Sequence, residues 1–221
     1  MEQGVGGGID GILRAMSRKR YAKLPILDLW GGCIGYEQPD KHIRIYECEK
    51  TLADNVIVPH HYSHKVTQNT CVSLLVYYHG KVKGAMQIGY GIRPKIKGEY
   101  DPDSVREFDR MWLSDEMPKY SETICLSLLH HYLRKAHPEI KVLISYADTS
   151  AGNKGTIYKA ANYELVDRLP VDFYLLPSGE RVHPVTMWHR HKTRSWAFLQ
   201  KQYPGIIHIQ EGEQLKFIKR L

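Results

Sequence analysis

The sequence predicts a mixed α/β fold with one central sheet flanked by helices, and three observations support this prediction. Apolar segments typical of strands recur along the chain, and segments with apolar residues at helical spacing lie between them. Hydrophobic residues make up 43% of the 221 residues and charged residues 25%, as in soluble globular proteins. This length suits one large domain, so we expect a catalytic domain over 41–221 and a loosely packed leader over 1–40.

The first half of the expected domain is predicted to contain a strand, a short helix and a hairpin. Residues 43–48 alternate in polarity and are rich in β-branched side chains, which favours a strand. Residues 49–58 follow as a short helix that stops before a proline. Residues 71–78 and 82–88 are apolar segments on either side of a tight turn, so we expect a β-hairpin. A loop rich in glycine and proline over 91–102 ends this half.

The second half alternates strands with helices. Residues 105–113 are predicted as a strand, and a helix is expected to be capped near Ser121, because apolar residues then recur at helical spacing. Residues 141–147 favour a buried strand and residues 152–161 a short helix, and strand character returns from Leu165. Such alternation is typical of a sheet with helices on its faces.

The charge balance favours a polyanionic partner. The formal net charge is +7 and the sequence pI is about 9.1, and a basic protein attracts nucleic acid electrostatically. A soluble basic protein without such a partner is the alternative. One basic cluster lies in the leader, over 14–23, where it is either a nucleic-acid arm or a solvated surface.

A second basic cluster, in the C-terminal part, interleaves cations with an aromatic ring. This composition suits contacts to phosphates and stacking on bases. We therefore predict DNA binding by four residues: Arg190, Lys192, Arg194 and Trp196. An ordinary solvated segment is the alternative, and a closing strand over 215–218 is expected beyond it.

Cysteine spacing and hydropathy point to the cytoplasm. The four cysteines are widely spaced and form no CxxC pair, which argues for a reducing compartment and against a cysteine-based zinc site. We find neither an apolar run of ~18 residues nor a signal-peptide pattern. We therefore expect no membrane association.

Three motifs, in order, carry a resemblance to a known family. The first is His61-Tyr62-Ser63, and the second is Arg110-Met111-Trp112-Leu113-Ser114 followed by Pro118-Lys119-Tyr120-Ser121-Glu122. The third is Ser145-Tyr146-Ala147-Asp148 with Asn153, Gly155, Ile157-Tyr158 and Ala160. Over about residues 43–170 the chain resembles the Mom family, and its order of elements resembles the GNAT acyltransferase fold.

The resemblance implies a DNA-modifying enzyme that acts in the cytoplasm of an infected bacterial host. Mom proteins place a carbamoylmethyl (acetamido) group on the exocyclic amine of adenine in phage DNA, which shields it from host restriction, and iron has been proposed for this chemistry. Double-stranded DNA is then the partner, while a homodimer remains open. Two alternatives are a GNAT-type N-acyltransferase acting on a protein or small-molecule amine, and a non-catalytic nucleic-acid-binding protein.

Candidate catalytic residues come from the motif regions. Adenine N6 is a poor nucleophile, so a base must remove its proton once the nucleotide has left the helix. The catalytic candidates are Asp148, Tyr158, His61 and Tyr62, with His61 and Asp148 as provisional iron ligands. Tyr78 and Tyr146 are candidates for stacking on the flipped base. The structural alternatives are a capping role for Asp148, a core position for Tyr158 and a structural histidine.

Candidate donor-binding residues flank two predicted helix starts. They are Ser114, Lys119, Ser121 and Glu122 before one helix, and Asn153 and Gly155 before the other. An acetyl-CoA enzyme has a glycine-rich loop at the first position, where backbone N–H groups hold the pyrophosphate. This chain has no glycine there and carries two acids. An acyl-CoA and an aminoacyl-tRNA therefore both remain candidate donors, the second with tRNA as a further partner.

Overall fold

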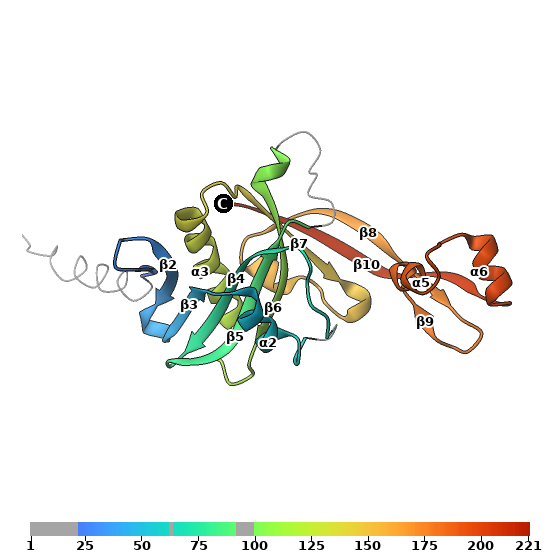
Figure 1. Cartoon of the computed structure of the whole chain (residues 1–221), viewed down its shortest axis with the longest axis horizontal. Helices are drawn as coiled ribbons and strands as arrows, with labels where there is room; N and C mark the ends of the chain where they lie inside the picture. Colours follow the sequence, from blue (N-terminus) through green and yellow to red (C-terminus); the bar gives the residue numbers. More distant parts are fainter. Residues whose placement is uncertain (1–21, 62–63, 92–99) are drawn as a thin grey trace, which may run out of the picture. The chain divides into compact units, whose positions relative to one another are not determined.

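The computed structural model describes residues 22–61, 64–91 and 100–221. These residues form two compact units, shown with their elements in Figure 1. The first unit runs to Ser145 and includes Lys219–Leu221, and the second is Tyr146–Ile218. The expected mixed α/β class, a sheet flanked by helices, is confirmed. In the described part of the chain, no helix is long and apolar enough to cross a membrane.

The strands of the first unit lie side by side in chain order. They are β1 (Leu24–Leu27), β2 (Cys33–Gln38), β3 (Ile43–Glu47), β4 (Thr70–Tyr78), β5 (Lys81–Gly89), β6 (Val105–Leu113) and β7 (Val142–Asp148), which continues into the second unit. All neighbours are antiparallel except β6 and β7, which are parallel. We expected a loosely packed leader through residue 40, but 24–38 forms β1 and β2, which extend the sheet beyond β3.

The helices α2 (Lys50–Ile57) and α3 (Ser121–Ala136) cover opposite faces of this sheet. Ala53 and Ile57 of α2 pack with Leu75 and Ala85. On the other face, the Tyr132 hydroxyl of α3 donates a hydrogen bond to Glu47. Since Glu47 pairs with Leu74, and Leu74 and Leu75 point to opposite sides, the two helices lie on different faces.

The helix α3 begins at Ser121, near which its cap was predicted. Tyr120 occupies the N-cap position in the left-handed region, with φ of 72°, and its side chain makes no capping hydrogen bond. Ser121 is the first helical residue, and its hydroxyl donates to the Pro118 carbonyl oxygen at 2.6 Å. The hydroxyl is therefore directed back to the preceding turn, away from the amide groups of the helix.

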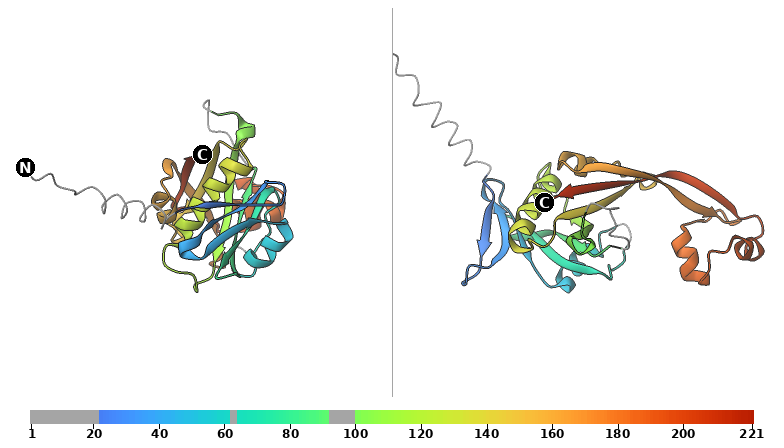
Figure 2. Two further views of the ribbon diagram at one scale, coloured as in Figure 1. Left: turned by 90° about the vertical axis from the view of Figure 1, so that its left-hand side faces the viewer. Right: turned by 90° about the horizontal axis from the view of Figure 1, so that it is seen from above.

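The second unit is built on a long antiparallel ribbon, which Figure 2 shows from two further directions. Its elements are α4 (Thr156–Ala160), β8 (Glu164–Leu175), β9 (Arg181–Val182), α5 (Pro184–His191), α6 (Trp196–Gln202) and β10 (Ile207–Arg220). The expected helix over 152–161 shortens to α4, because a 3-10 turn over Thr149–Ala151 and a left-handed Gly152 precede it. The closing strand is much longer than expected, and α5 and α6 had no counterpart in the prediction.

Two irregularities of β6 shape its C-terminal half. Gln87 of β5 pairs with Arg110 and Ile88 pairs with Phe108, so Asp109 is an extra residue that forms a β-bulge. The parallel pairing with β7 covers only three positions and ends where Glu107 meets Ile144. Beyond this point β6 continues to Leu113 without further pairing to β7.

The first prediction concerns the contact between β2 and β3. A Cβ atom at Gly35 would lie 2.1 Å from the Ile45 carbonyl oxygen, so Gly35→Ala must separate the two strands. We expect a loss of about 1–3 kcal/mol in the free energy of unfolding, measured by urea denaturation. Ile34→Ala, at an exposed position of the same strand, is the matched control and should change stability little. Equal stability of Gly35→Ala and the parent chain would show that β2 does not pack as described.

Candidate active site

The bulge in β6 places a carboxylate in an unusual environment. Burial is the main reason that the pKa of Asp109 is raised to about 7; the nearby Glu107 also raises it, and Arg110 opposes the shift. A Cβ atom on Gly89 would lie 2.4 Å from the Asp109 Oδ2, so only glycine leaves room for this carboxyl group. At neutral pH Asp109 therefore exchanges a proton readily, as a general base must.

Arg110, the next residue, brings a hydrogen-bond donor to the same place. Its Nη1 is buried and has no hydrogen-bond partner among the described residues. Buried guanidinium nitrogens are normally paired, because an unpaired one loses its hydration without compensation. An unpartnered nitrogen beside a proton-exchanging carboxyl group is therefore suited to an acceptor atom of a substrate.

Two histidines from the loop after α2 approach this part of β6. The imidazole of His60 stacks on the Trp112 indole, with 4.1 Å between ring centroids and an angle of 14° between the planes. Burial lowers the pKa of His61, and the charge of Arg110 adds to this effect. His61 is consequently neutral at pH 7 and can accept a proton. The motif prediction for His61 thus gains the neighbour Arg110, while Trp112 is a partner of His60.

A buried hydrogen-bond network holds α2 against β5 beside these residues. Asp54 of α2 accepts a hydrogen bond from Gln87 Nε2 at 2.8 Å and forms an ion pair with Lys50. Gln87 Oε1 in turn accepts from the Thr67 hydroxyl at 3.1 Å, and Thr67 bonds Thr70 at 2.6 Å. Because Gln87 pairs with Arg110 across the strands, this network fixes the backbone that carries the bulge.

The predicted donor-binding residues of the first unit lie between β6 and α3. Ser114 follows β6 directly, and its backbone N–H donates to the Lys83 carbonyl oxygen at 2.8 Å. Lys119 lies on the turn before α3, where its ammonium group contacts the Tyr120 ring, and Glu122 is exposed in the first turn. Glu116 is paired with Lys83 at 2.6 Å, so one of the two acids in this turn is neutralised.

The third motif forms a compact turn in the second unit. Asp148 Oδ1 accepts hydrogen bonds from the backbone N–H of Ser150 at 2.8 Å and from its hydroxyl at 2.6 Å. Asn153 Oδ1 accepts from the Gly155 N–H at 3.0 Å. Tyr158 is 7% exposed and packs against Phe217 and Tyr163. These contacts give Asp148 the capping role named as its alternative, and Tyr158 a core environment.

The sequence analysis did not identify His183 as a neighbour of Asp148. Burial lowers the pKa of His183, the charge of Asp148 raises it, and the charge of Arg194 lowers it. His183 therefore lies within electrostatic range of a predicted catalytic carboxylate and of a predicted DNA-binding cation. Residues 148 and 183 are far apart in the sequence, so no local pattern indicates this proximity.

The predicted stacking tyrosines and the iron ligands are distributed between different places. Tyr78 is on the α3 face of the sheet, where its ring contacts His79 at 4.3 Å, and is therefore on the opposite face from the α2 network. Tyr146 belongs to the second unit, and Tyr62 lies outside the described residues. His61 belongs to the first unit and Asp148 to the second.

The fit of iron was tested on the side chains themselves. Over residues 22–61, 64–91 and 100–221, no group of three histidine, cysteine, aspartate or glutamate side chains is arranged to hold a metal ion. An iron site with two histidines and a carboxylate needs such a group. The described residues therefore offer no such group of ligands for the proposed iron.

Comparisons with known proteins place the chain in a family. Two similar solved structures are a GNAT family acetyltransferase from Elizabethkingia anophelis with acetyl-CoA bound (14% identity, TM-score 0.42) and a Bacillus subtilis acetyltransferase in complex with CoA (8% identity, TM-score 0.46). Each comparison covers 81% of this chain and 99% of the other.

The Mom protein family model matches residues 42–221. Methylcarbamoylase mom of Escherichia phage Mu is 30% identical over 166 residues, which are 73% of this chain and 68% of the phage Mu protein. The chain therefore belongs to the Mom protein family and shares the transferase class of its phage Mu relative.

Proposed function

We propose that this protein modifies phage DNA by transferring a carbamoylmethyl group to the exocyclic N6 of adenine. Membership of the Mom family and the name of the phage Mu relative support this reaction class. The observation that carries the proposal is the unpartnered Arg110 Nη1 beside Asp109, whose pKa is near neutrality. We place the reaction in the cytoplasm of the infected host, where duplex DNA is the substrate and the modification blocks restriction.

The proposed chemistry is a proton transfer coupled to bond formation at nitrogen. Adenine N6 attacks the methylene carbon of an electrophilic carbamoylmethyl donor, so an N–C bond forms while the bond to the leaving group breaks with its electron pair. Asp109 takes the N6 proton, and Arg110 Nη1 donates a hydrogen bond to the carbonyl oxygen of the transferred group. The flipped base stacks on the exposed His60 ring, which itself lies on the partly buried Trp112.

The donor is proposed to bind at the turn before α3. Lys119 offers a positive charge there, and the α3 N-terminus offers backbone N–H groups, both of which suit an anionic donor. Ser114, Ser121 and Glu122 border this turn. The pairing of Glu116 with Lys83 removes part of the repulsion that the sequence predicted for phosphate. An acyl-CoA and an aminoacyl-tRNA are both anionic, but each carries its leaving group on a carbonyl carbon and would give an N-acyl adenine. The carbamoylmethyl product requires an anionic donor whose methylene carbon bears the leaving group.

The third motif is proposed to act through contacts within the second unit. The Oδ1 of Asp148 accepts the hydrogen bonds from Ser150. Its other carboxylate oxygen is proposed to orient the imidazole of His183, with which Asp148 interacts electrostatically. Asn153 and Gly155 order the turn that precedes Tyr158. The roles of Tyr146 and Tyr78 in base binding and of Tyr62 in catalysis remain proposals from the motif resemblance.

Nucleoside mass spectrometry tests the proposed reaction. Plasmid DNA from bacteria that express this chain should contain deoxyadenosine with the mass added by a carbamoylmethyl group. Arg110→Lys keeps the charge but cannot place Nη1, so it should reduce the modified fraction by at least about tenfold in folded protein. Unmodified nucleosides from cells with soluble protein would refute the adenine-modification proposal. Acylated host proteins in those cells would favour an N-acyltransferase instead.

The raised pKa of Asp109 predicts opposite effects of one substitution on activity and stability. The unfolded carboxyl group ionises near its ordinary value of 3.8 and the folded one only near 7, so its contribution to stability is lost as pH rises through 7. Asp109→Asn should therefore stabilise the protein above about pH 8, by roughly 1–3 kcal/mol, and little near about pH 4. It should lower the modification rate at least about 100-fold.

The neighbouring carboxylate supplies the control for Asp109. Glu107 raises the pKa of Asp109, so Glu107→Gln should keep activity and shift its pH profile to lower pH. Urea denaturation at two pH values and single-turnover assays give both readouts. If Asp109→Asn modifies DNA at the parent rate, Asp109 is not the base.

A further inference from the structure

The second unit contains a long segment without acidic residues. Residues 181–210 include five lysines and arginines and four histidines, but no aspartate or glutamate. The whole chain has a formal net charge of only +7, so this segment carries most of the excess. Such a concentration of one sign of charge creates a local field that attracts a polyanion.

This segment folds as a module with its own small core at the end of the β8–β10 ribbon that carries α5 and α6 (Figure 1). Met187 of α5 and Leu199 of α6 are fully buried and pack with Tyr174 and Val182. His191 Nε2 and the Tyr203 hydroxyl are 2.8 Å apart and join the two helices. The cations are therefore presented by an ordered surface.

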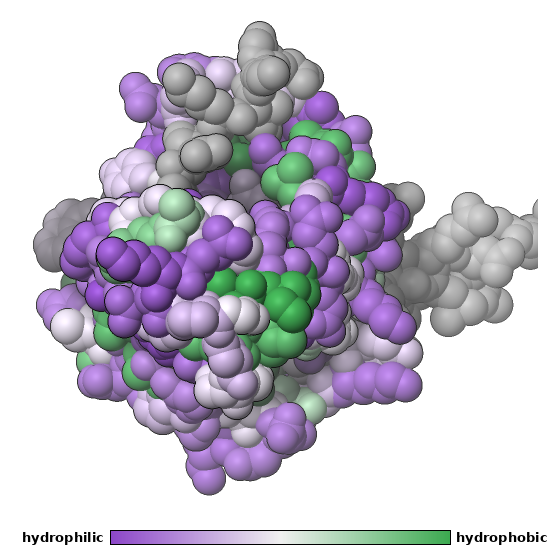
Figure 3. Space-filling view, turned by 90° about the vertical axis from the view of Figure 1, so that its right-hand side faces the viewer, coloured by the Kyte–Doolittle hydropathy of each residue, from purple (hydrophilic) through white to green (hydrophobic). Residues whose placement is uncertain are grey.

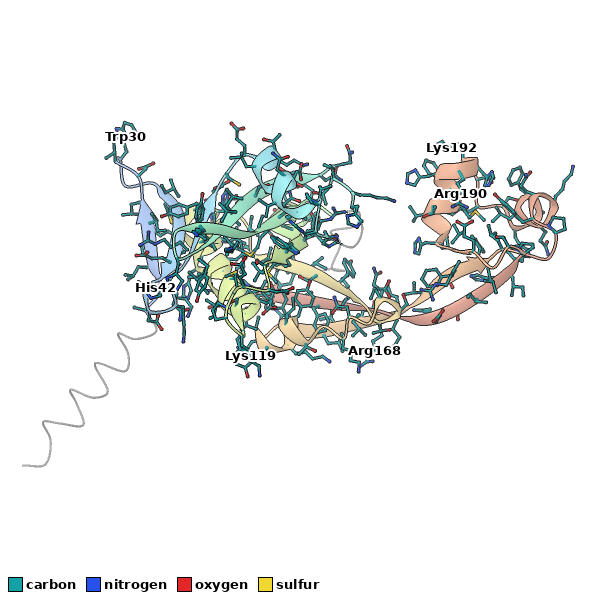
Figure 4. All side chains as sticks on the ribbon, turned by 90° about the horizontal axis from the view of Figure 1, so that it is seen from below. Trp30, His42, Lys119, Arg168, Arg190 and Lys192 are labelled. Carbon is teal, nitrogen blue, oxygen red and sulfur yellow. The ribbon has the colours of Figure 1, made fainter. Side chains whose placement is uncertain are left out.

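Arg190 of this module forms an exposed ion pair. Its guanidinium forms two hydrogen bonds with Glu180, at 2.5 and 3.2 Å, and so attaches α5 to the turn after β8. Figure 4 shows Arg190 and Lys192 on α5, away from Arg168 of the same unit. A cation engaged by a carboxylate has less capacity for phosphate, so Arg190 is better described as a residue that positions α5.

The outer surface of the module combines cations with aromatic rings. Lys192 lies 5.0 Å above the Trp188 ring, whose residue is 42% exposed, and the exposed Arg194 follows. Trp196 is 39% exposed and stacks on Tyr174 at 5.9 Å. Figure 3 views the molecule from this end and shows apolar residues bordered by hydrophilic ones. Cations beside flat rings suit a sugar–phosphate backbone with accessible base or sugar faces.

One residue of the module interacts with the third motif. His183, at the N-cap of α5, interacts electrostatically with both Asp148 and Arg194. This connection lies entirely within the second unit.

We propose that the module over 181–210 is the duplex-DNA-binding surface, with Lys192 and Arg194 on phosphates and Trp188 packed against the strand. This inference rests on the proposed function, whose substrate it locates. Trp188 was absent from the predicted DNA-binding set, and Arg190 moves from a DNA contact to a positioning role.

Fluorescence anisotropy with the full chain and a labelled DNA duplex tests the proposal. Lys192→Ala/Arg194→Ala should weaken binding at least about tenfold and reduce the slope of log K against log [KCl] by about 0.9 for each lost phosphate contact. Trp188→Ala should weaken binding without changing this slope. Trp188→Phe should restore the affinity. Lys135→Ala/Lys141→Ala, which removes the same charge from exposed positions of the first unit, is the matched control and should bind like the parent.

The outcomes separate this inference from the proposed function. Unchanged affinity and salt slope for Lys192→Ala/Arg194→Ala, in a parent that modifies adenine, would overturn the binding surface alone. Loss of affinity for tRNA with unchanged affinity for the duplex would also overturn it, as would a change in oligomeric state with unchanged DNA binding. A parent chain that leaves adenine unmodified but binds DNA through this module would refute the reaction and keep the surface.

Discussion

Between Phe108 and Arg110, β6 holds one residue more than β5 opposite it. This extra residue is Asp109, and its carboxyl group points into a partly buried space that exists only because position 89 is glycine. It also fixes the direction of Arg110, whose backbone pairs with Gln87 and whose Nη1 is unpartnered among the described residues. Without the extra residue, every side chain of β6 beyond Phe108 would point to the other face of the sheet, and Arg110 and Trp112 would both leave the face that α2 covers. The candidate active site depends on this register.

This arrangement lowers the stability of the folded protein, and the surrounding fold compensates for the loss. A carboxyl group with a raised pKa and an unpaired guanidinium nitrogen both destabilise a folded protein relative to paired groups. The network of Asp54, Gln87 and Thr67 counters this cost by fixing α2 and β5 with satisfied hydrogen bonds. Reactive groups and their rigid support thus lie on the same face of the sheet, which is the arrangement that preorganised catalysis requires.

Sequence patterns predicted the elements that are stabilised locally and missed those that depend on pairing. The hairpin of β4 and β5 and the helix α3 have clear periodicity, and both are present. The strands over 24–38 were not expected, because they gain stability mainly by pairing with β3. The helices α5 and α6 are short, and the small core in which they bury their apolar side chains also needs Tyr174 and Val182 from the ribbon. Local sequence carries little of this information.

The site could be predicted only where a motif identified it. His61 was selected from the motif resemblance, and the structure adds its neighbour Arg110. Asp109 was not selected, since a bulge depends on the register between two strands and leaves no mark in either strand alone. His183 was missed because its proximity to Asp148 results from the path of the whole ribbon.

The ionisation of Asp109 is the property on which the account is most directly tested. In protein labelled with ¹³C at aspartate carboxyl carbons, the Asp109 resonance can be assigned by its absence in Asp109→Asn and followed as pH changes. We expect a midpoint near 7 in the folded protein. A midpoint near the ordinary aspartate value of about 4 would show that the bulge does not prepare this carboxyl group as a base, and would contradict the proposed site.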